Sequence, residues 1–239
     1  MIRRRGAPDP ERPSGPAAGR VTALTPQRHD PERLNVFLDG AFAFGLGLDL
    51  ALREGLAVGD DLDEERVAAL VAADEAGKAT SAALALLAHR PRAAREVRDR
   101  LRQKGYSGGA IDAAVTRLEG WNYLDDAAFA RAWVENRAAH KPRGERLLAQ
   151  ELRRKGVAAE TVAETIAAAE LDEAGAALEL ARAKVRAYAG LEPAVARRRL
   201  GAYLGRRGYG YDVVGPVLER VFGEDEDVGD GEGDPDFVE

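Results

Sequence analysis

Three glycines recur along this chain at nearly constant spacing, and the apolar residues around them recur as well. Gly105, Gly156 and Gly208 are 51 and 52 residues apart. Apolar residues lie four and eight residues before each glycine and six, ten and thirteen residues after it: Val97, Leu101, Ile111, Val115, Leu118; Leu148, Leu152, Val162, Ile166, Ala169; Leu200, Leu204, Val214, Leu218 and Val221. These offsets place side chains on one face of a helix. The sequence therefore predicts a pair of amphipathic helices joined at a glycine, three times over.

Each pair of helices has further repeated features at its borders. Glycine tolerates the left-handed backbone that ends many helices, so each glycine should end the first helix of its pair. Pro91, Pro142 and Pro193 lie fourteen or fifteen residues before the glycines, and we expect each in the first helical turn. One more helical stretch precedes each pair, at residues 80–90, 126–140 and 172–188. A three-helix unit of this size buries little apolar surface by itself. The units should therefore stack on one another and form an elongated, curved rod.

A shorter pattern with a period of two residues precedes the repeats. Residues 21–25 and 34–38 are candidate strands, and residues 41–48 form the returning strand of a hairpin. Asp39 and Gly40 between the last two strands favour the positive φ angles of a tight hairpin turn. We expect Asp49 to cap a short helix that ends near Gly55. A second helix should be capped within residues 60–64 and run through Leu70 and Val71.

The predicted fold class is mainly α, with a small N-terminal β-hairpin region ahead of the three repeats. The predicted organisation is a disordered basic arm at 1–20, the β-hairpin with short helices at 21–78, repeats at 79–124, 125–171 and 172–222, and a disordered acidic tail at 223–239. The arm is rich in proline and glycine, and the tail carries nine of the chain's acidic residues.

The composition argues against most kinds of catalytic site. The chain has no cysteine and three scattered histidines, so it offers no thiol chemistry and no metal-ligand cluster. No glycine-rich phosphate loop occurs. No apolar run is long enough to span a bilayer, and no secretory signal is recognised at the start. We therefore expect a cytoplasmic protein that is not an enzyme, with no catalytic residue, no metal, no cofactor and no membrane contact.

The net charge of −6 combines two opposite regions. Residues 80–222 contain 25 Lys and Arg against 18 Asp and Glu, whereas acidic residues predominate elsewhere. The position ten residues before each glycine lies about 200° round the helix from the buried positions and should face solvent. It holds arginine in all three repeats, namely Arg95, Arg146 and Arg198. A basic helical body is therefore expected to bind an anionic partner.

Other basic residues recur at equivalent positions and complete the predicted partner-binding set. They are Arg102 and Arg153 three residues before the glycine, Arg92 and Arg143 thirteen before it, and Lys104, Lys155 and Arg207 directly before it. Gly205 and Val195 interrupt two of these series. Cations at a helix C-terminus also complement the helix dipole, which would explain the last three without a partner. That explanation fails for Arg95, Arg146 and Arg198, which lie nearer the helix N-termini.

Aromatic residues have two possible roles. Trp121, Tyr123, Phe129 and Trp133 lie where the first repeat meets the second, at spacings that favour a packed core between repeats. A platform for stacking bases would require exposed rings. Tyr106, Tyr209 and Tyr211 near the glycine turns are the better candidates for exposure. Asp125 and Asp126 most simply cap the following helix.

Several segments together resemble a known family. They are Ala83-Leu84 with Leu87, Arg90-Pro91-Arg92, Val97 with Leu101, Lys104-Gly105, Tyr123-Leu124-Asp125-Asp126 with Phe129-Ala130, and Leu152 with Lys155-Gly156. This combination resembles the RecX family over residues 80–222, more loosely in the third repeat. The resemblance implies a monomer that binds in the groove of the RecA–single-stranded-DNA filament and bridges RecA subunits. RecA's ATP hydrolysis, strand exchange and co-protease activity would then be inhibited.

Two other functions fit the same residues. The repeats could form a stand-alone binder of single- or double-stranded DNA, or a transcriptional repressor with helix-turn-helix-like repeats. Specific binding of naked DNA at physiological salt, without RecA, would distinguish a stand-alone DNA-binding protein from a RecA regulator. A helical scaffold for some other acidic protein would show neither activity.

Overall fold

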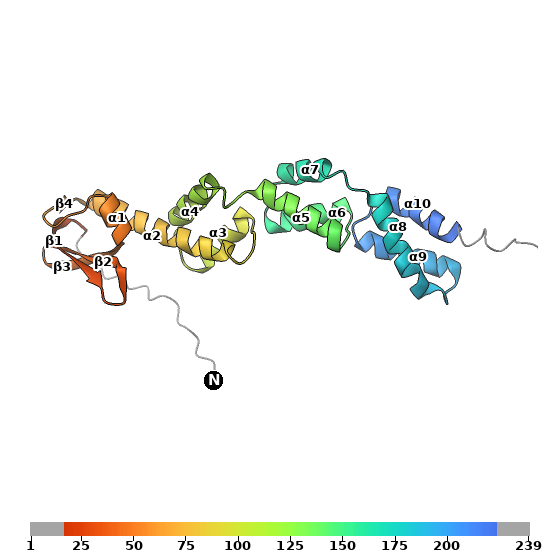
Figure 1. Ribbon diagram of the computed structural model, residues 1–239, viewed down its shortest axis with the longest axis horizontal. Coiled ribbons are helices and arrows are strands. Elements are labelled where there is room, and N and C mark those ends of the chain that lie inside the picture. Colours follow the sequence, from red (N-terminus) through yellow and green to blue (C-terminus); the bar gives the residue numbers. More distant parts are fainter. Residues whose placement is uncertain (1–16, 224–239) are drawn as a thin grey trace, which may run out of the picture. The chain divides into compact units, whose positions relative to one another are not determined.

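The computed structural model describes residues 17–223, and the chain divides into two compact units, Met1–Leu124 and Asp125–Glu239. Most of the predicted basic arm and nearly all of the predicted acidic tail lie outside the described residues. The described part is mainly helical, with a small antiparallel sheet at its N-terminal end (Figure 1). This agrees with the predicted fold class.

The N-terminal sheet has four strands in the order β3-β2-β1-β4, all paired antiparallel. They are β1 (Gly19–Gln27), β2 (Asp30–Leu38), β3 (Ala41–Gly47) and β4 (Asp61–Leu62). The predicted hairpin is confirmed, because Asp39 and Gly40 have φ angles of 48° and 83° between β2 and β3. Two features differ from the prediction: β1 begins inside the predicted arm, and the two-residue strand β4 has no recognisable sequence pattern.

One face of the sheet forms the core of the N-terminal region. Val21, Val36, Leu38 and Leu46 are fully buried there and pack with the short helix α1 (Leu48–Arg53). The prediction that Asp49 caps α1 was wrong. The cap position is Gly47, with no side-chain bond.

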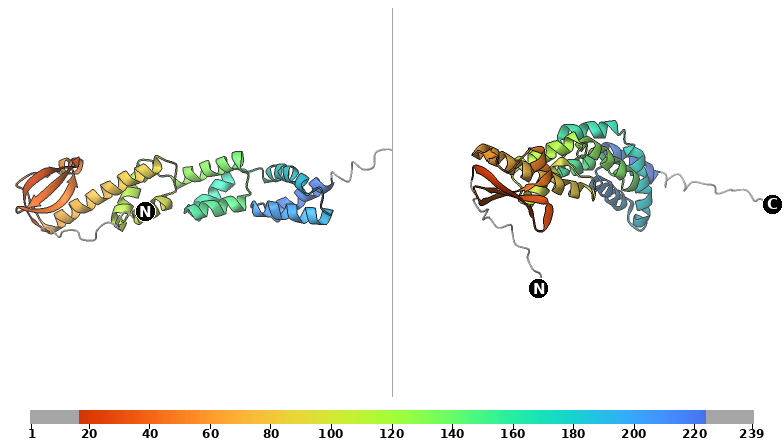
Figure 2. Two further views of the ribbon diagram at one scale, coloured as in Figure 1. Left: turned by 90° about the horizontal axis from the view of Figure 1, so that it is seen from below. Right: turned by 60° about the vertical axis from the view of Figure 1, so that its left-hand side comes forward.

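A single helix, α2 (Glu64–Leu87), joins the sheet to the first repeat (Figures 1 and 2). Its 24 residues span about 36 Å at 1.5 Å per residue. The prediction of two helices with a break between residues 71 and 80 was wrong, because the intervening alanine-rich segment contains no proline and favours helix. The predicted cap within residues 60–64 is confirmed, since the Asp63 carboxylate accepts a hydrogen bond from the Arg66 amide.

A buried carboxylate on α2 fixes the helix against the sheet. Asp74 accepts two hydrogen bonds from the Arg33 guanidinium at 2.9 and 3.0 Å and one from the Gly47 amide at 2.9 Å. Lys78 lies 2.8 Å away on the next turn of α2. Burial alone would raise the pKa of Asp74, but the hydrogen bonds from Arg33 and Lys78 outweigh it, so this pKa lies below its ordinary value. The carboxylate therefore stays charged at neutral pH.

Replacing Asp74 with asparagine is expected to lower the free energy of unfolding by about 2–3 kcal/mol, because the Arg33 charge is left against the core. A lowered carboxyl pKa stabilises the fold above the ordinary pKa of 3.8, and the stabilisation is lost as pH falls through the lowered value. Urea unfolding followed by circular dichroism should show the full difference above about pH 5 and a shrinking one below pH 3.8. Glu65→Gln, at an exposed site on the same helix, is the control. A difference that persists undiminished in acid would contradict the assignment.

The first repeat consists of the second half of α2 with α3 (Ala94–Gln103) and α4 (Gly108–Gly120). Ala79 and Ala83 of α2 are fully buried against Val97, Leu101 and the apolar face of α4. Small residues on α2 let the helices approach closely, which explains why this long helix needs few large apolar side chains.

The second unit contains the other two repeats. The second repeat comprises α5 (Asp126–His140), α6 (Glu145–Lys155) and α7 (Ala159–Ala168). The third comprises α8 (Glu173–Val185) with the 3-10 turn η1 (Arg186–Tyr188), α9 (Pro193–Arg206) and α10 (Tyr211–Gly223). Asp125 caps α5 as predicted, by accepting a hydrogen bond from the Ala128 amide.

The glycine periodicity describes the repeats well. Gly105, Gly156 and Gly208 have φ angles of 89°, 95° and 97°, so each occupies the predicted left-handed position. Of the predicted apolar positions, all are buried except Ala169, because α7 ends one residue earlier. The proline prediction holds only for Pro193, the first residue of α9. Pro91 and Pro142 precede α3 and α6 by three residues and lie in the connecting segments.

Candidate partner-binding surface

Arginine occupies the same exposed position on the middle helix of all three repeats. Arg95 and Arg146 are the second residues of α3 and α6, and Arg198 lies in the second turn of α9. All three side chains are exposed, as predicted, and none forms an ion pair with another described residue. A cation near a helix N-terminus opposes the helix dipole. The fold therefore gains nothing visible from these charges, and binding to an anionic partner would account for them.

Two of the predicted site residues, Arg92 and Arg143, form ion pairs within their own repeats. The Arg92 side chain is only 11% exposed. It donates to the Leu86 carbonyl and forms an ion pair with Glu96, one helical turn along. Arg143 forms an ion pair with Glu151 at 3.1 Å. Arg92 connects α2 to α3, and Arg143 ties the segment before α6 to that helix, so both are poor candidates for partner contacts.

The remaining predicted residues lie near the helix C-termini, where the dipole favours cations. Lys104 and Arg207 follow the last residues of α3 and α9, and Lys155 ends α6. Lys155 and Arg207 also pack on aromatic rings within their own repeats, at 4.1 Å from Trp133 and 5.0 Å from Tyr203. The last two residues of the predicted set are exposed: Arg102, paired with Asp99 at 2.7 Å, and Arg153.

Glu151 organises the centre of the second repeat. One carboxylate oxygen accepts hydrogen bonds from Trp133 Nε1 and Arg137 Nε, both at 2.9 Å. The Arg137 guanidinium and the Lys155 ammonium both lie over the Trp133 ring, at 4.3 and 4.1 Å from its centroid. Burial would raise the pKa of Glu151, but the hydrogen bonds from Arg137 and Trp133 hold it below its ordinary value. The cluster fixes α5 against α6 through charge-assisted contacts.

Replacing Glu151 with alanine is expected to destabilise the second unit by about 2–3 kcal/mol, because Arg137, Arg143 and the indole N–H lose their shared acceptor. The chain has two tryptophans, so a Trp121→Phe background leaves Trp133 as a local reporter. The midpoint of urea unfolding, followed by the fluorescence of Trp133, should shift to a lower urea concentration in the Glu151→Ala variant. Glu135→Ala on the exposed side of α5 should leave the midpoint within error. Equal midpoints for both variants would contradict the assigned role.

The prediction that four aromatic residues form one packed core was wrong for two of them. Phe129 is buried and its ring lies 6.0 Å from that of Trp133. Trp121 and Tyr123 are 53% and 61% exposed, on the turn that follows α4. Of the tyrosines near glycine turns, Tyr211 is exposed as expected, whereas Tyr209 is buried.

The second and third repeats are held together by a close backbone contact. The Gly144 amide donates to the Arg207 carbonyl at 2.9 Å, and the Glu145 amide donates to the Glu173 carboxylate at 2.8 Å. A Cβ atom on Gly144 would lie 2.4 Å from the backbone of Gly208, so the contact requires glycine. The N-terminus of α6 is thereby fixed against the α9–α10 turn.

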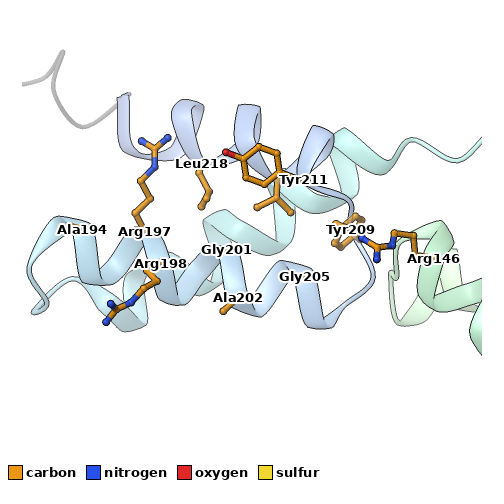
Figure 3. Close-up of a pocket in the computed structure, with 11 residues that line it drawn as sticks. Arg146, Ala194, Arg197, Arg198, Gly201, Ala202, Gly205, Tyr209, Tyr211 and Leu218 are labelled. Carbon is orange, nitrogen blue, oxygen red and sulfur yellow. The ribbon is translucent and has the colours of Figure 1, made fainter.

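This contact brings Arg146 to the end of a groove along α9 (Figure 3). The groove has a volume of about 560 Å³ and lies entirely within the second unit. Arg146, Arg197, Arg198 and Tyr211 are among the residues that line it. Arg197 was not predicted, although the run of three arginines at 197–199 is a visible signal.

Other kinds of site were also sought within residues 17–223. No group of three metal-ligating side chains was found among them. In that part of the chain, every helix is too short or too polar to cross a bilayer.

Four family models match successive parts of the chain. The RecX N-terminal domain matches residues 19–63, and the first, second and third RecX three-helix domains match residues 79–118, 125–166 and 172–218. Together they cover more than half of the sequence. The chain belongs to the RecX family. The predicted resemblance over residues 80–222 is thereby confirmed, and the match also covers the N-terminal β region, for which no resemblance was predicted.

Relatives in this family are named regulatory protein RecX. That of Bacillus licheniformis is 30% identical over 208 residues, which are 87% of this chain and 79% of the relative. That of Clostridium botulinum strain Alaska E43 is 32% identical over 205 residues, or 84% and 96% of the two chains. Among solved structures, a regulatory protein RecX has a TM-score of 0.70 at 23% identity, covering 84% of this chain and 99% of its own. RecX from Lactobacillus salivarius has a TM-score of 0.58 at 20% identity, covering 63% and 98%. The two structures support the shared fold.

Proposed function

We propose that this protein is a negative regulator of RecA that binds in the groove of the RecA–single-stranded-DNA filament. Binding inhibits RecA's ATPase, strand-exchange and co-protease activities. The family membership supports a regulatory role, and the protein acts as a cytoplasmic monomer without a cofactor or catalytic residue of its own.

The observation that carries the proposal is the recurrence of Arg95, Arg146 and Arg198. These three side chains are exposed, none of them lies at a helix C-terminus where the dipole would favour a cation, and all lie at the same distance in sequence from the glycine of their repeat. A partner whose acidic or phosphate groups also repeat along its length can contact all three. The RecA filament has such a periodic surface, with DNA phosphates bound inside it.

The proposed mechanism is bridging of neighbouring RecA subunits. Successive repeats contact successive subunits, which favours an inactive arrangement or blocks growth at the filament end. Long-range attraction between the basic helices and the acidic or phosphate partner speeds association, so inhibition should weaken as salt is raised.

The proposal is tested by comparing two partners at physiological salt. The full chain is titrated against RecA filaments formed on labelled single-stranded DNA, and against the same DNA, or its duplex form, without RecA. Tighter binding to the filament by about tenfold or more supports the proposal. Sequence-specific binding to naked duplex, with no added affinity for the filament, would contradict it and favour a stand-alone DNA-binding protein.

A further inference from the structure

The groove along α9 exists because the third repeat lacks side chains that the first repeat has. Gly201, Ala202 and Gly205 form its floor, with Leu218 of α10 beside them (Figure 3). At the equivalent positions relative to the glycine turn, α3 of the first repeat has long or charged residues: Arg98, Asp99 and Arg102. There Arg98 and Arg102 form ion pairs across the helix surface. Removing these side chains exposes a small apolar surface on α9.

Cations lie at both ends of this apolar floor. Arg197 and Arg198 lie at one end, and Arg146 lies at the other, beside Tyr209 (Figure 3). Arg197 has only a long contact to Glu219 at 3.9 Å, and Arg146 and Arg198 form no ion pair with another described residue. From Arg198 to Gly205 the helix rises about 10 Å, or about three steps of a stacked nucleic-acid strand.

An exposed aromatic ring flanks the groove. Tyr211, the first residue of α10, is 89% exposed, although the side chain of Tyr209 two residues earlier is buried. The equivalent residues of the first two repeats are Gly108 and Ala159, so the ring is specific to the third repeat. The buried Tyr209 hydroxyl has no hydrogen-bond partner among the described residues, and burial raises the pKa of Tyr209 to about 12. It therefore stays neutral, adding no negative charge at the Arg146 end.

We propose that this groove binds single-stranded nucleic acid, with phosphates on Arg146 and Arg198 and a base stacked on Tyr211. Single-strand sites combine a positively charged groove with aromatic rings on which bases stack, and both features are present here. A volume of about 560 Å³ is of the size that a short stretch of single strand occupies. The inference deepens the proposed function, on which it rests, by assigning this part of the surface to the DNA strand rather than to RecA.

An acidic protein surface fits the groove less well. Carboxylates would satisfy the arginines, but they leave the exposed ring and the apolar floor without a contact. A single strand presents a phosphate at every nucleotide and flat bases that can stack on an exposed ring, so it can supply both kinds of contact.

The test is fluorescence anisotropy of a labelled oligothymidylate of about 12 nucleotides, titrated with the full chain in the absence of RecA. Tyr211→Ala should weaken binding by about 5- to 150-fold, since stacking on one ring contributes that much. Tyr123→Ala, which removes another exposed tyrosine, should leave the affinity unchanged. Arg198→Gln should reduce the slope of log affinity against log salt by about 0.7, as expected for one lost phosphate contact on a single strand. Arg199→Gln, its neighbour outside the groove, should not.

A filled groove provides a test that does not rely on damaging the fold. A side chain at Gly205 would extend into open space, so Gly205→Gln should occupy the groove without a clash. Glutamine also favours helix over glycine, so the thermal midpoint should not fall. Binding of the oligonucleotide should nevertheless weaken about tenfold or more, whereas Gly215→Gln on α10 should leave it intact.

The outcomes separate this inference from the proposed function. Unchanged affinity in both Tyr211→Ala and Gly205→Gln would overturn the groove assignment, as would equal losses in Arg198→Gln and Arg199→Gln, which indicate diffuse charge attraction. If the wild type still inhibits RecA in that case, the proposed function stands and the groove faces protein. If the variants lose affinity for the oligonucleotide as expected but the wild type leaves RecA's ATPase unaffected, the assignment of the groove stands and the proposed function fails.

Discussion

Simultaneous replacement of Arg95, Arg146 and Arg198 by glutamate is expected to raise the amount of protein needed to inhibit RecA's ATPase by at least about 100-fold. Each change places a negative charge where an acidic or phosphate partner is proposed, and like charges brought together across an interface cost several kcal/mol. The folded chain should be unaffected, since these side chains are exposed and form no ion pair with another described residue. Circular dichroism checks the helix content alongside the single-strand-dependent ATPase assay.

The matched control changes the same helices by the same charge. Arg100, Arg154 and Arg199 are exposed on α3, α6 and α9 but lie outside the predicted set. Their replacement by glutamate should weaken inhibition by only a few-fold, through the change in net charge alone. Full inhibition by the first variant, or an equal loss in both, would contradict the assigned surface.

Gly144→Ala is expected to have the second largest effect, by separating the second and third repeats. A Cβ atom would lie 2.4–2.6 Å from the backbone of Gly208 and Tyr209, where no side-chain rotation can relieve the clash. Opening the contact would also break the hydrogen bond from Gly144 to Arg207. We expect a loss of about 2–3 kcal/mol in the stability of the second unit, at the upper range for overpacking. RecA inhibition should also weaken, because Arg146 is no longer held at the end of the groove that Arg198 lines.

Hydrogen exchange and urea unfolding measure this effect. The Glu145 amide, which donates to Glu173, should exchange faster in the variant. The matched control is Gly205→Ala, where the added methyl meets open space and should stabilise α9 by about 0.5–1 kcal/mol. Unchanged protection at Glu145 would show that the contact tolerates a methyl group and would contradict the role assigned to Gly144.

The repeat architecture was predictable because its signals are local. The spacing of apolar residues around Gly105, Gly156 and Gly208 directly indicates which face of each helix is buried. Asp39-Gly40 predicts a tight turn, because both residues readily adopt positive φ angles. Helix boundaries were less predictable. The segment between Leu70 and Thr80 contains Gly77, which weakens a helix, and has no strong apolar period, so its sequence does not reveal that α2 continues through it and packs in two cores.

The candidate surface was predicted only in part, because exposure depends on neighbours in three dimensions. Helical position alone distinguished Arg95, Arg146 and Arg198. Helical position did not identify Arg92 as partly buried. The presence of Glu96 one helical turn later does, however, indicate an ion pair between Arg92 and Glu96. To predict the groove along α9, one must know that its floor, with Gly201 and Gly205, ends at Arg146 of another repeat. That arrangement follows from the Gly144 contact and from no local pattern.

The most direct test of RecA regulation is the single-strand-dependent ATPase rate of RecA from the same organism as the full chain is titrated in. The proposed function predicts inhibition at well below one molecule per RecA, because one bound chain bridges several subunits or blocks filament growth. No inhibition, even with the protein in excess and at low salt, would contradict it.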